Sequence, residues 1–159
     1  MRTTLCAASL AMLLASGASA TTIGVSMQSF DNNFQTLLRH GIEDRAKEVG
    51  VDVQVEDAQA DVGKQLDQVN NFIASNVDAI IVTLADTSAA PALTSAAEAA
   101  GIPLVYVNLE PVNVATLPDD EAYIGSKETE SGKLGAEEAC RLMKAAGKGQ
   151  NGAYILMGD

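Results

Sequence analysis

Histidine and cysteine are scarce in this chain: one residue of 159 is histidine and two are cysteine. His40 falls on the polar side of a predicted helix, so histidine-paired nucleophiles and multi-histidine metal sites lack their main component. No G-x-x-x-x-G-K-[ST] loop, G-x-G-x-x-G pattern or G-x-S-x-G elbow is present. These absences argue against an enzyme, and we expect no cofactor and no metal.

Positive charge is also scarce. Ten Lys and Arg residues face 21 Asp and Glu residues, which gives a net charge of −11. Binding to nucleic acid or to an anionic membrane requires clustered Lys and Arg, so neither partner is expected. The balance suits an exported protein that handles neutral solutes.

The first twenty residues have the pattern of an export signal. Arg2 supplies the positive charge, Leu5–Leu14 an apolar run, and Ala18-Ser19-Ala20 a small-residue cleavage site, so we expect cleavage after Ala20. The run is too short to span a bilayer of roughly 30 Å. Of the two cysteines only Cys140 would remain, so no intrachain disulfide is expected, and we expect Cys140 to pack against a helix face.

Strand-like and helix-like segments alternate along the chain, which predicts an α/β fold with a doubly wound parallel sheet. The expected strands are Thr22–Met27, Val51–Glu56, Val77–Leu84, Pro103–Val107 and Ala122–Gly125. The strand at Ala79–Val82 is apolar throughout, which indicates helices on both faces of the sheet. The helices between the strands should face inward with Phe34, Leu37, Leu38, Ile42, Ala46 and Val49; with Val62, Leu66, Val69 and Ile73; and with Leu93, Ala96, Ala97 and Ala100.

The chain changes character after Val107. A polar connection with the acidic run Asp119-Asp120-Glu121, expected to be a solvated loop, leads to a helix over Lys127–Ala146. A turn over Gly147–Gly152 and a strand over Ala153–Met157 then follow. A strand with no helix to cover it predicts that the sequence is a fragment cut early in a second lobe.

The loop Phe30–Phe34 is the first candidate binding site. It follows a buried strand, and open α/β sheets bind ligands outside the carboxyl ends of their strands. A sugar or cyclitol offers an apolar C–H face to an aromatic ring such as Phe34 and hydroxyls to Asp31, Asn32 and Asn33. The alternative makes Asp31 or Asn32 a helix N-cap and Phe34 a core anchor. The residues alone leave both open.

Two further polar segments follow expected strands. Asn108 comes directly after the strand that ends at Val107, where it can face a ligand or merely begin a turn. One residue of Asp86-Thr87-Ser88 is expected to cap the Ala-rich helix rather than bind a ligand. Gly50 and Gly101 are expected at helix C-termini, in the left-handed conformation.

Four blocks of this chain resemble the periplasmic sugar-binding proteins of the glucose/galactose and ribose type. They read IGVSMQSFDNNFQTLLRHGIE, DAQADVGKQLDQVNNFIA, GIPLVYVNLEP and AYIGSKETESGKLGAEEA. Their details also resemble binders of inositol- and rhizopine-like cyclitols. The resemblance implies a periplasmic binding protein fold of type I, a two-lobed clamp that closes on one sugar. Residues 21–126 would form the first lobe, 127–159 the start of the second, and Ser126 and Lys127 the hinge.

The resemblance also implies roles for individual residues. Phe34 matches the ring that stacks on the sugar, while Asn32 and Asn108 match positions that bind its hydroxyls. Glucose/galactose binders carry Asp where this chain has Asn32, which puts that specificity in doubt. Leu109 stands where the family often has Lys or Arg, so one charged hydrogen bond to the ligand is missing.

The implied function is capture of a monosaccharide or cyclitol in the periplasm and its delivery, without chemical change, to the permease of an ABC importer. A chemoreceptor is a further implied partner, and we expect a monomer. The alternatives are a sugar-responsive regulatory or chemosensory receptor of the same fold and an exported α/β hydrolase. A fragment that lacks half of the ligand contacts should bind sugar weakly or not at all.

Overall fold

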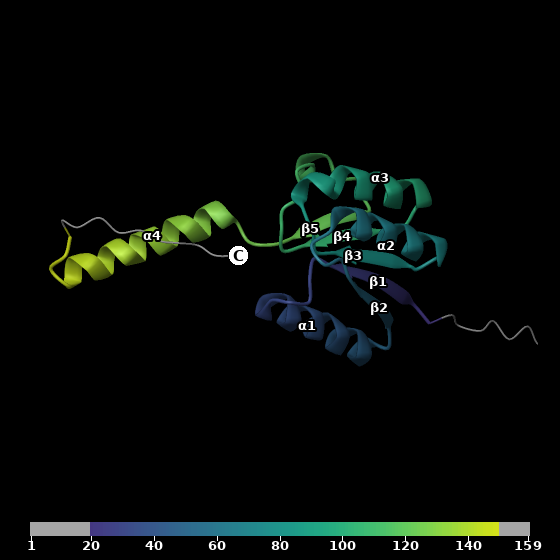
Figure 1. Ribbon diagram of the computed structural model, residues 1–159, viewed down its shortest axis with the longest axis horizontal. Helices are drawn as coiled ribbons and strands as arrows, with labels where there is room; N and C mark the ends of the chain where they lie inside the picture. Colours follow the sequence, from purple (N-terminus) through teal and green to yellow (C-terminus); the bar gives the residue numbers. More distant parts are fainter. Residues whose placement is uncertain (1–19, 150–159) are drawn as a thin grey trace, which may run out of the picture.

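The computed structural model describes residues 20–149 and shows five parallel strands in the order β2-β1-β3-β4-β5 (Figure 1). The order reverses direction between β1 and β3, so successive crossovers place helices on opposite faces of the sheet. The expected α/β class with a parallel, doubly wound sheet is confirmed. The strands are β1 (Thr22–Met27), β2 (Asp52–Asp57), β3 (Ala79–Val82), β4 (Leu104–Val107) and β5 (Glu121–Ile124).

Three α-helices flank the sheet and a fourth leaves it. In Figure 1, α2 and α3 lie on one face and α1 on the other, while α4 extends away to the left from the end of β5. The α-helices are α1 (Asn33–Val49), α2 (Val62–Ala74), α3 (Ala90–Ala100) and α4 (Glu128–Ala145). Two 3-10 turns, η1 (Thr87–Ala89) and η2 (Val114–Thr116), precede α3 and β5.

The helix ends follow from local chemistry. Gly50 and Gly101 adopt φ values of 75° and 66° at the C-termini of α1 and α3, as predicted. Asp86 accepts a hydrogen bond from the amide of Ser88 over 2.8 Å and so caps η1, which leads directly into α3. The cap thus falls on η1, whereas the N-cap of α3 itself is Ala89, which makes no side-chain hydrogen bond, so the expected cap of the Ala-rich helix is displaced to the turn before it.

The main core lies between the sheet and the pair α2 and α3. Phe72, Ile80, Leu93 and Tyr106 are at most 1% exposed there. Gly24 of β1 permits this packing, because a Cβ atom at that position would lie 2.5 Å from the ring of Phe72. The helix therefore sits closer to the strand than any side chain would allow.

The face of α1 differs from the prediction. Leu37 is 64% exposed and Val49 50%, whereas the buried residues of α1 are Gln35 and Ala46. Among the described residues, α1 is the one helix on its side of the sheet, so its apolar stripe is only partly covered (Figure 1). The prediction that helices cover both faces of β3 therefore holds only in part: Ile81, on the α1 side, is only half-buried.

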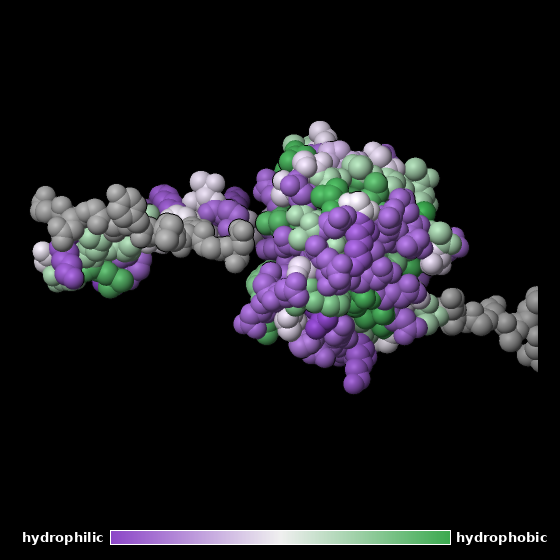
Figure 2. Space-filling view, in the orientation of Figure 1, coloured by the Kyte–Doolittle hydropathy of each residue, from purple (hydrophilic) through white to green (hydrophobic). Residues whose placement is uncertain are grey.

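The other predicted inward faces are partly right. Val69, Leu93 and Ala97 are buried, whereas Val62 and Ala100 are exposed. Figure 2 shows apolar patches (green) reaching the surface between hydrophilic side chains (purple).

The last described element, α4, has no buried residue. Cys140 is exposed on it, so the prediction that this cysteine is packed against a helix face is wrong. The expected signal and the strand at Ala153–Met157 lie outside the described residues. Within residues 20–149, no helix combines the length and the apolar character needed to cross a membrane.

Candidate functional site

A hollow of about 530 Å³ opens at the carboxyl ends of β1 and β4. It brings together residues from three separate stretches of sequence: the loop after β1 with the start of α1, the residues after β4, and the start of α4. Three of the four predicted ligand-binding residues line it. The lining residues are Gln28, Asn32, Asn33, Phe34, Gln35, Asn108, Leu109 and Glu128.

The Asn32 side chain caps α1 and also lines the hollow. Its backbone is extended (φ −106°, ψ 152°), and its Oδ1 accepts a hydrogen bond from the amide of Gln35 over 2.7 Å. This makes Asn32 the N-cap of α1. Because Oδ1 is occupied by the cap, the amide Nδ2 is the group that remains to donate toward the hollow.

Phe34 is 55% exposed and lines the hollow, so the alternative that made it a core anchor is wrong. An aromatic ring left in the open beside amide groups suits the apolar face of a sugar ring. Asp31 is exposed and does not line the hollow; its backbone amide donates to Oγ of Ser29 over 2.9 Å. The structure thus separates Asp31 from the other three predicted residues.

Asn108 is held in an unusual backbone conformation, with φ of 78°. Its backbone N–H donates to the carbonyl oxygen of Ile124 over 2.9 Å, and its backbone carbonyl oxygen accepts from the Tyr123 hydroxyl over 3.0 Å. Asparagine tolerates the left-handed region better than most residues. These two bonds fix the turn after β4, so the Asn108 side chain is aimed by β5.

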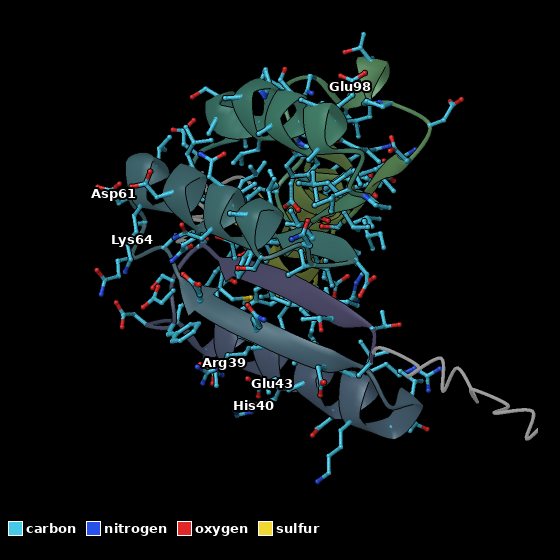
Figure 3. All side chains as sticks on the ribbon, turned by 90° about the vertical axis from the view of Figure 1, so that its right-hand side faces the viewer. Arg39, His40, Glu43, Asp61, Lys64 and Glu98 are labelled. Carbon is cyan, nitrogen blue, oxygen red and sulfur yellow. The ribbon has the colours of Figure 1, made fainter. Side chains whose placement is uncertain are left out.

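The loop after β1 is fastened by a stacked pair that the sequence did not reveal. The guanidinium carbon of Arg39 lies 4.2 Å from the ring centroid of Phe30, a cation–π distance. Figure 3 shows Arg39 on α1, one residue before His40. His40 is exposed, as its predicted place on the polar side of the helix requires. The stack joins the loop to the second turn of the helix that follows it.

Two glutamines form the floor of the hollow, and sequence reasoning missed both. Gln35, 1% exposed, donates from Nε2 to Oε1 of Gln28 over 3.2 Å and accepts at Oε1 from the hydroxyl of Thr83 over 3.2 Å. The backbone N–H of Gln28 in turn donates to the Thr83 hydroxyl over 2.6 Å. Because Oε1 of Gln28 is occupied, its Nε2 remains free to donate into the hollow. The position of Gln28 directly after β1 was the signal available.

A second polar layer lies beneath this floor. Ser26 donates to Oε1 of Gln68 over 2.7 Å, and Gln65 donates to the carbonyl oxygen of Thr83 over 3.0 Å. The amide of Ala85 donates to Oε1 of Gln65 over 2.9 Å. Ser26, Gln65 and Gln68 are at most 3% exposed. Buried networks of this kind fix a single geometry when their members are satisfied, so the ends of β1 and β3 are rigid.

The electrostatics of the hollow are close to neutral. Glu128 is its one ionisable lining residue, and no Lys or Arg lines it. Leu109, which stands where the resembling family often has Lys or Arg, lines the hollow with an apolar side chain. Among residues 20–149, no group of three or more His, Cys, Asp or Glu side chains could hold a metal ion. Amides and one aromatic ring suit a neutral polyhydroxylated ligand better than a phosphate.

A second hollow, of about 490 Å³, lies between α1 and the sheet. It is lined by aliphatic side chains such as Leu38, Ile42 and Val53, with Arg45 as the one charged residue. It offers almost no hydrogen-bonding groups, so it cannot recognise a hydroxylated ligand.

The expected hinge follows β5 without regular structure. Gly125, Ser126 and Lys127 connect β5 to α4, and the Ser126 hydroxyl donates to Oε1 of Glu128 over 2.5 Å. A Cβ atom on Gly125 would collide with the Tyr123 hydroxyl. The connection therefore leaves the sheet immediately beside the turn that carries Asn108.

Comparison with known proteins adds to this geometry. The periplasmic binding protein domain family matches residues 23–158. The chain is 51% identical over 150 residues to a protein of Rhizobium meliloti named as rhizopine-binding, covering 94% of this chain and 47% of the relative. It is 33% identical over 133 residues to the D-galactose/methyl-galactoside binding periplasmic protein of Haemophilus influenzae, covering 82% and 40%.

A solved structure shares both fold and sequence. The ABC transporter solute binding protein of Bacillus halodurans with bound myo-inositol superposes with a TM-score of 0.70 at 34% identity, over 81% of this chain and 44% of that one. The chain spans about half the length of the curated relatives it matches.

Proposed function

Because the chain belongs to the family of periplasmic binding protein domains, we propose that it captures a sugar or cyclitol and delivers it unchanged to an ABC importer. The ligand would lie in the hollow beside β1 and β4. Phe34 would stack on its C–H face, and the amides of Gln28, Asn32 and Asn108 would bind its hydroxyls.

One observation carries this proposal: an exposed aromatic ring meets the amide side chains of Gln28, Asn32, Asn33 and Asn108 at the carboxyl edge of the sheet, beside the buried Gln35. Soluble proteins seldom leave a phenylalanine open beside so many unused donors and acceptors unless a ligand covers it. No nucleophile, metal group or acid–base pair lines the hollow, so binding without chemical change is the function it suits.

The cyclitol branch of the proposal has support from relatives. The Bacillus halodurans structure holds myo-inositol, and the Rhizobium meliloti relative is named for rhizopine. The uncharged Asn32 and the apolar Leu109 favour a ligand without a negative group. We therefore place inositols ahead of hexoses and pentoses as candidates.

The proposed organisation follows the earlier expectations. Residues 21–126 form one lobe, residues 127–159 begin the second, and Ser126 and Lys127 form the hinge. Cleavage after Ala20 would release the protein into the periplasm, where the importer permease is its partner. The described lobe supplies one wall of the site, so the chain alone is expected to bind its ligand weakly.

Isothermal titration with myo-inositol, D-galactose and D-ribose tests the proposal. It is applied to the chain and to a chimera in which the second half of the Rhizobium meliloti relative follows residue 126. We expect strong binding of one ligand by the chimera and recovery of that ligand unchanged. Ligand at a hundred times its dissociation constant should stabilise the chimera by about 2.7 kcal/mol.

The variants Asn32→Ala, Phe34→Ala and Asn108→Ala should each abolish that binding, whereas Asp31→Ala, outside the hollow, should leave it intact. Binding that survives all three substitutions would refute the site. A ligand converted to another compound would refute the function.

A further inference from the structure

A partly buried polar cluster beneath α3 has no part in the hollow. Its centre is the hydroxyl of Thr94 on α3, which is 7% exposed. Around it lie Tyr106 of β4, Glu121 of β5 and Asn113 from the loop between these strands. The acidic run was expected to be a solvated loop; Glu121 instead begins β5 and turns its carboxyl group inward, which corrects that expectation.

The distances in the cluster are all those of real hydrogen bonds. Oγ1 of Thr94 lies 2.8 Å from Oε2 of Glu121, 2.9 Å from the Tyr106 hydroxyl and 3.1 Å from Nδ2 of Asn113. The Tyr106 hydroxyl also lies 2.9 Å from the carbonyl oxygen of Ala90. Each oxygen–oxygen contact at such a distance needs one proton between its atoms.

The protons can be counted. Three oxygen–oxygen contacts join Glu121, Thr94, Tyr106 and the Ala90 carbonyl in a line, and Asn113 supplies its own proton to Thr94. The two hydroxyl groups carry one proton each. If Glu121 were ionised, one of the three contacts would have no proton, and the lone pairs of its two oxygen atoms would repel each other. A third proton is required, and the carboxyl group of Glu121 is the one place that can carry it.

We propose that Glu121 is a neutral carboxylic acid in the folded protein and that its proton closes a hydrogen-bond chain fastening β5 to α3. Glu121 donates to Thr94, Thr94 donates to Tyr106, and Tyr106 donates to the carbonyl oxygen of Ala90. In this arrangement Thr94 accepts twice and donates once, which is the full capacity of a hydroxyl group. Loss of the proton opens the chain and loosens the strand that runs into the connection 125–127.

A second observation agrees with a neutral acid. Oε1 of Glu121 is buried and has no hydrogen-bond partner among the described residues. An ionised carboxylate with one buried and unpaired oxygen would carry a large desolvation penalty, whereas the carbonyl oxygen of a neutral acid carries a smaller one.

The charged surroundings of Glu121 act in the same direction. Burial raises the pKa of Glu121, and the negative charges of Asp120 beside it and Glu98 on α3 raise it further, although a bond donated by Thr94 would lower it. Figure 3 shows Glu98 on α3. Tyr106 faces the cluster from β4, and burial is the main cause that raises its pKa to about 12, so it stays neutral. The neighbouring ionisable groups thus offer no positive charge to stabilise a carboxylate.

The sign of the pH effect follows from linkage. The folded state binds the proton of Glu121 more tightly than the unfolded state does. This group therefore makes its full contribution to the free energy of unfolding at a pH below the ordinary glutamate pKa of about 4.3. It is lost as the pH rises through the folded-state pKa. Each unit of separation between the two pKa values is a tenfold change in the folding constant.

The test is a titration of the side-chain carboxyl carbon of Glu121 by NMR in the full chain, with the signal assigned by its loss in Glu121→Gln. We expect a midpoint above the ordinary glutamate range. Thr94→Val distinguishes the two directions of the hydrogen bond. Removing an acceptor of the acid proton should lower the midpoint, whereas removing a donor to a carboxylate would raise it.

Glu98→Gln is the matched control, because it removes only a neighbouring negative charge and should lower the midpoint modestly. Urea unfolding from pH 4.5 to 8 gives an independent measurement. The folding constant of the wild type should fall with rising pH relative to that of Glu121→Gln. A midpoint in the ordinary range, or a midpoint that rises in Thr94→Val, would overturn the proposal.

Discussion

The Tyr123 hydroxyl donates to the carbonyl oxygen of Asn108 over 3.0 Å, and Asn108 is held at φ of 78°. The bond crosses from β5 to the end of β4 and lies immediately before the connection 125–127. A residue proposed to bind ligand is thus held in place by the strand that leads into that connection. A movement of that connection would reach Asn108 through this hydroxyl group and through the backbone hydrogen bond that Asn108 donates to Ile124.

Tyr123→Phe should weaken both stability and ligand binding. The ring is kept and the bond to Asn108 is lost, so the free energy of unfolding should fall by about 1 kcal/mol. Ligand affinity of the chimera should fall several-fold because Asn108 is less well oriented. Urea unfolding and isothermal titration measure the two effects. An unchanged affinity would show that Asn108 holds its position without Tyr123.

Asn108→Gly should separate the backbone of this residue from its side chain. Glycine adopts positive φ at no steric cost, so stability should hold or rise by up to about 1 kcal/mol. Binding should be lost with the amide group. Thermal unfolding and titration of the same sample give both readings. Retained binding would remove Asn108 from the proposed site.

Arg39→Ala should loosen the loop after β1 while leaving the core intact. The lost stack on Phe30 predicts a stability change of about 0.5–1 kcal/mol, with a larger relative loss of ligand affinity. Arg39→Lys should restore part of the affinity, since an ammonium group can also lie over the ring. His40→Ala, at the exposed neighbouring position, is the control and should change neither quantity.

Gln35→Ala should be costly, because Gln28 and Thr83 would each lose a buried partner. An unsatisfied buried polar group costs about 1–3 kcal/mol. Gln54→Ala on β2 is the matched control, because that side chain is exposed, and its effect should stay within about 0.5 kcal/mol. Urea unfolding at neutral pH compares the two. Equal effects would show that the glutamine floor does not stabilise the fold.

Two glycine substitutions should act in opposite directions. A Cβ atom on Gly24 would lie 2.5 Å from the Phe72 ring, so Gly24→Ala should destabilise the protein by about 1–3 kcal/mol. Gly41 lies in α1 with open space where its Cβ would be, so Gly41→Ala should stabilise it by about 0.5–1 kcal/mol. Thermal unfolding of both variants checks the pair, and a tolerated Gly24→Ala would contradict the close packing.

The sequence was most informative where one local signal decides the structure. The bounds of β1 are those predicted, because a β-rich run ends in a polar loop at Gln28. Gly50 and Gly101 stop their helices for a steric reason that needs no knowledge of the rest of the fold. The places of Asn32 and Phe34 beside the hollow were also anticipated from the strand end and the resemblance.

The wrong predictions of burial have a common cause. The pattern of polar and apolar residues along a segment does not show which of its faces another segment covers. The stripe with Leu37 was expected inside, yet one helix alone covers that side among residues 20–149. Gln35 and Glu121 look like surface residues in the sequence, yet Gln35 is buried and Glu121 half-buried, because polar groups from distant segments bind both side chains. Such long-range satisfaction of polar groups leaves no trace in local periodicity.

The glutamine floor of the hollow has a consequence for how the protein meets a changing environment. Amide groups neither gain nor lose protons under physiological conditions, so Gln28 and Gln35 present the same donors and acceptors in acid and in neutral medium. Glu128 is the one ionisable residue that lines the hollow beside them. The cluster at Glu121, beneath α3, would respond to that same change. The amide floor and the Glu121 cluster therefore differ in their response to acidity: the first keeps its protons, whereas the proposed proton of the second makes the stability of β5 depend on pH.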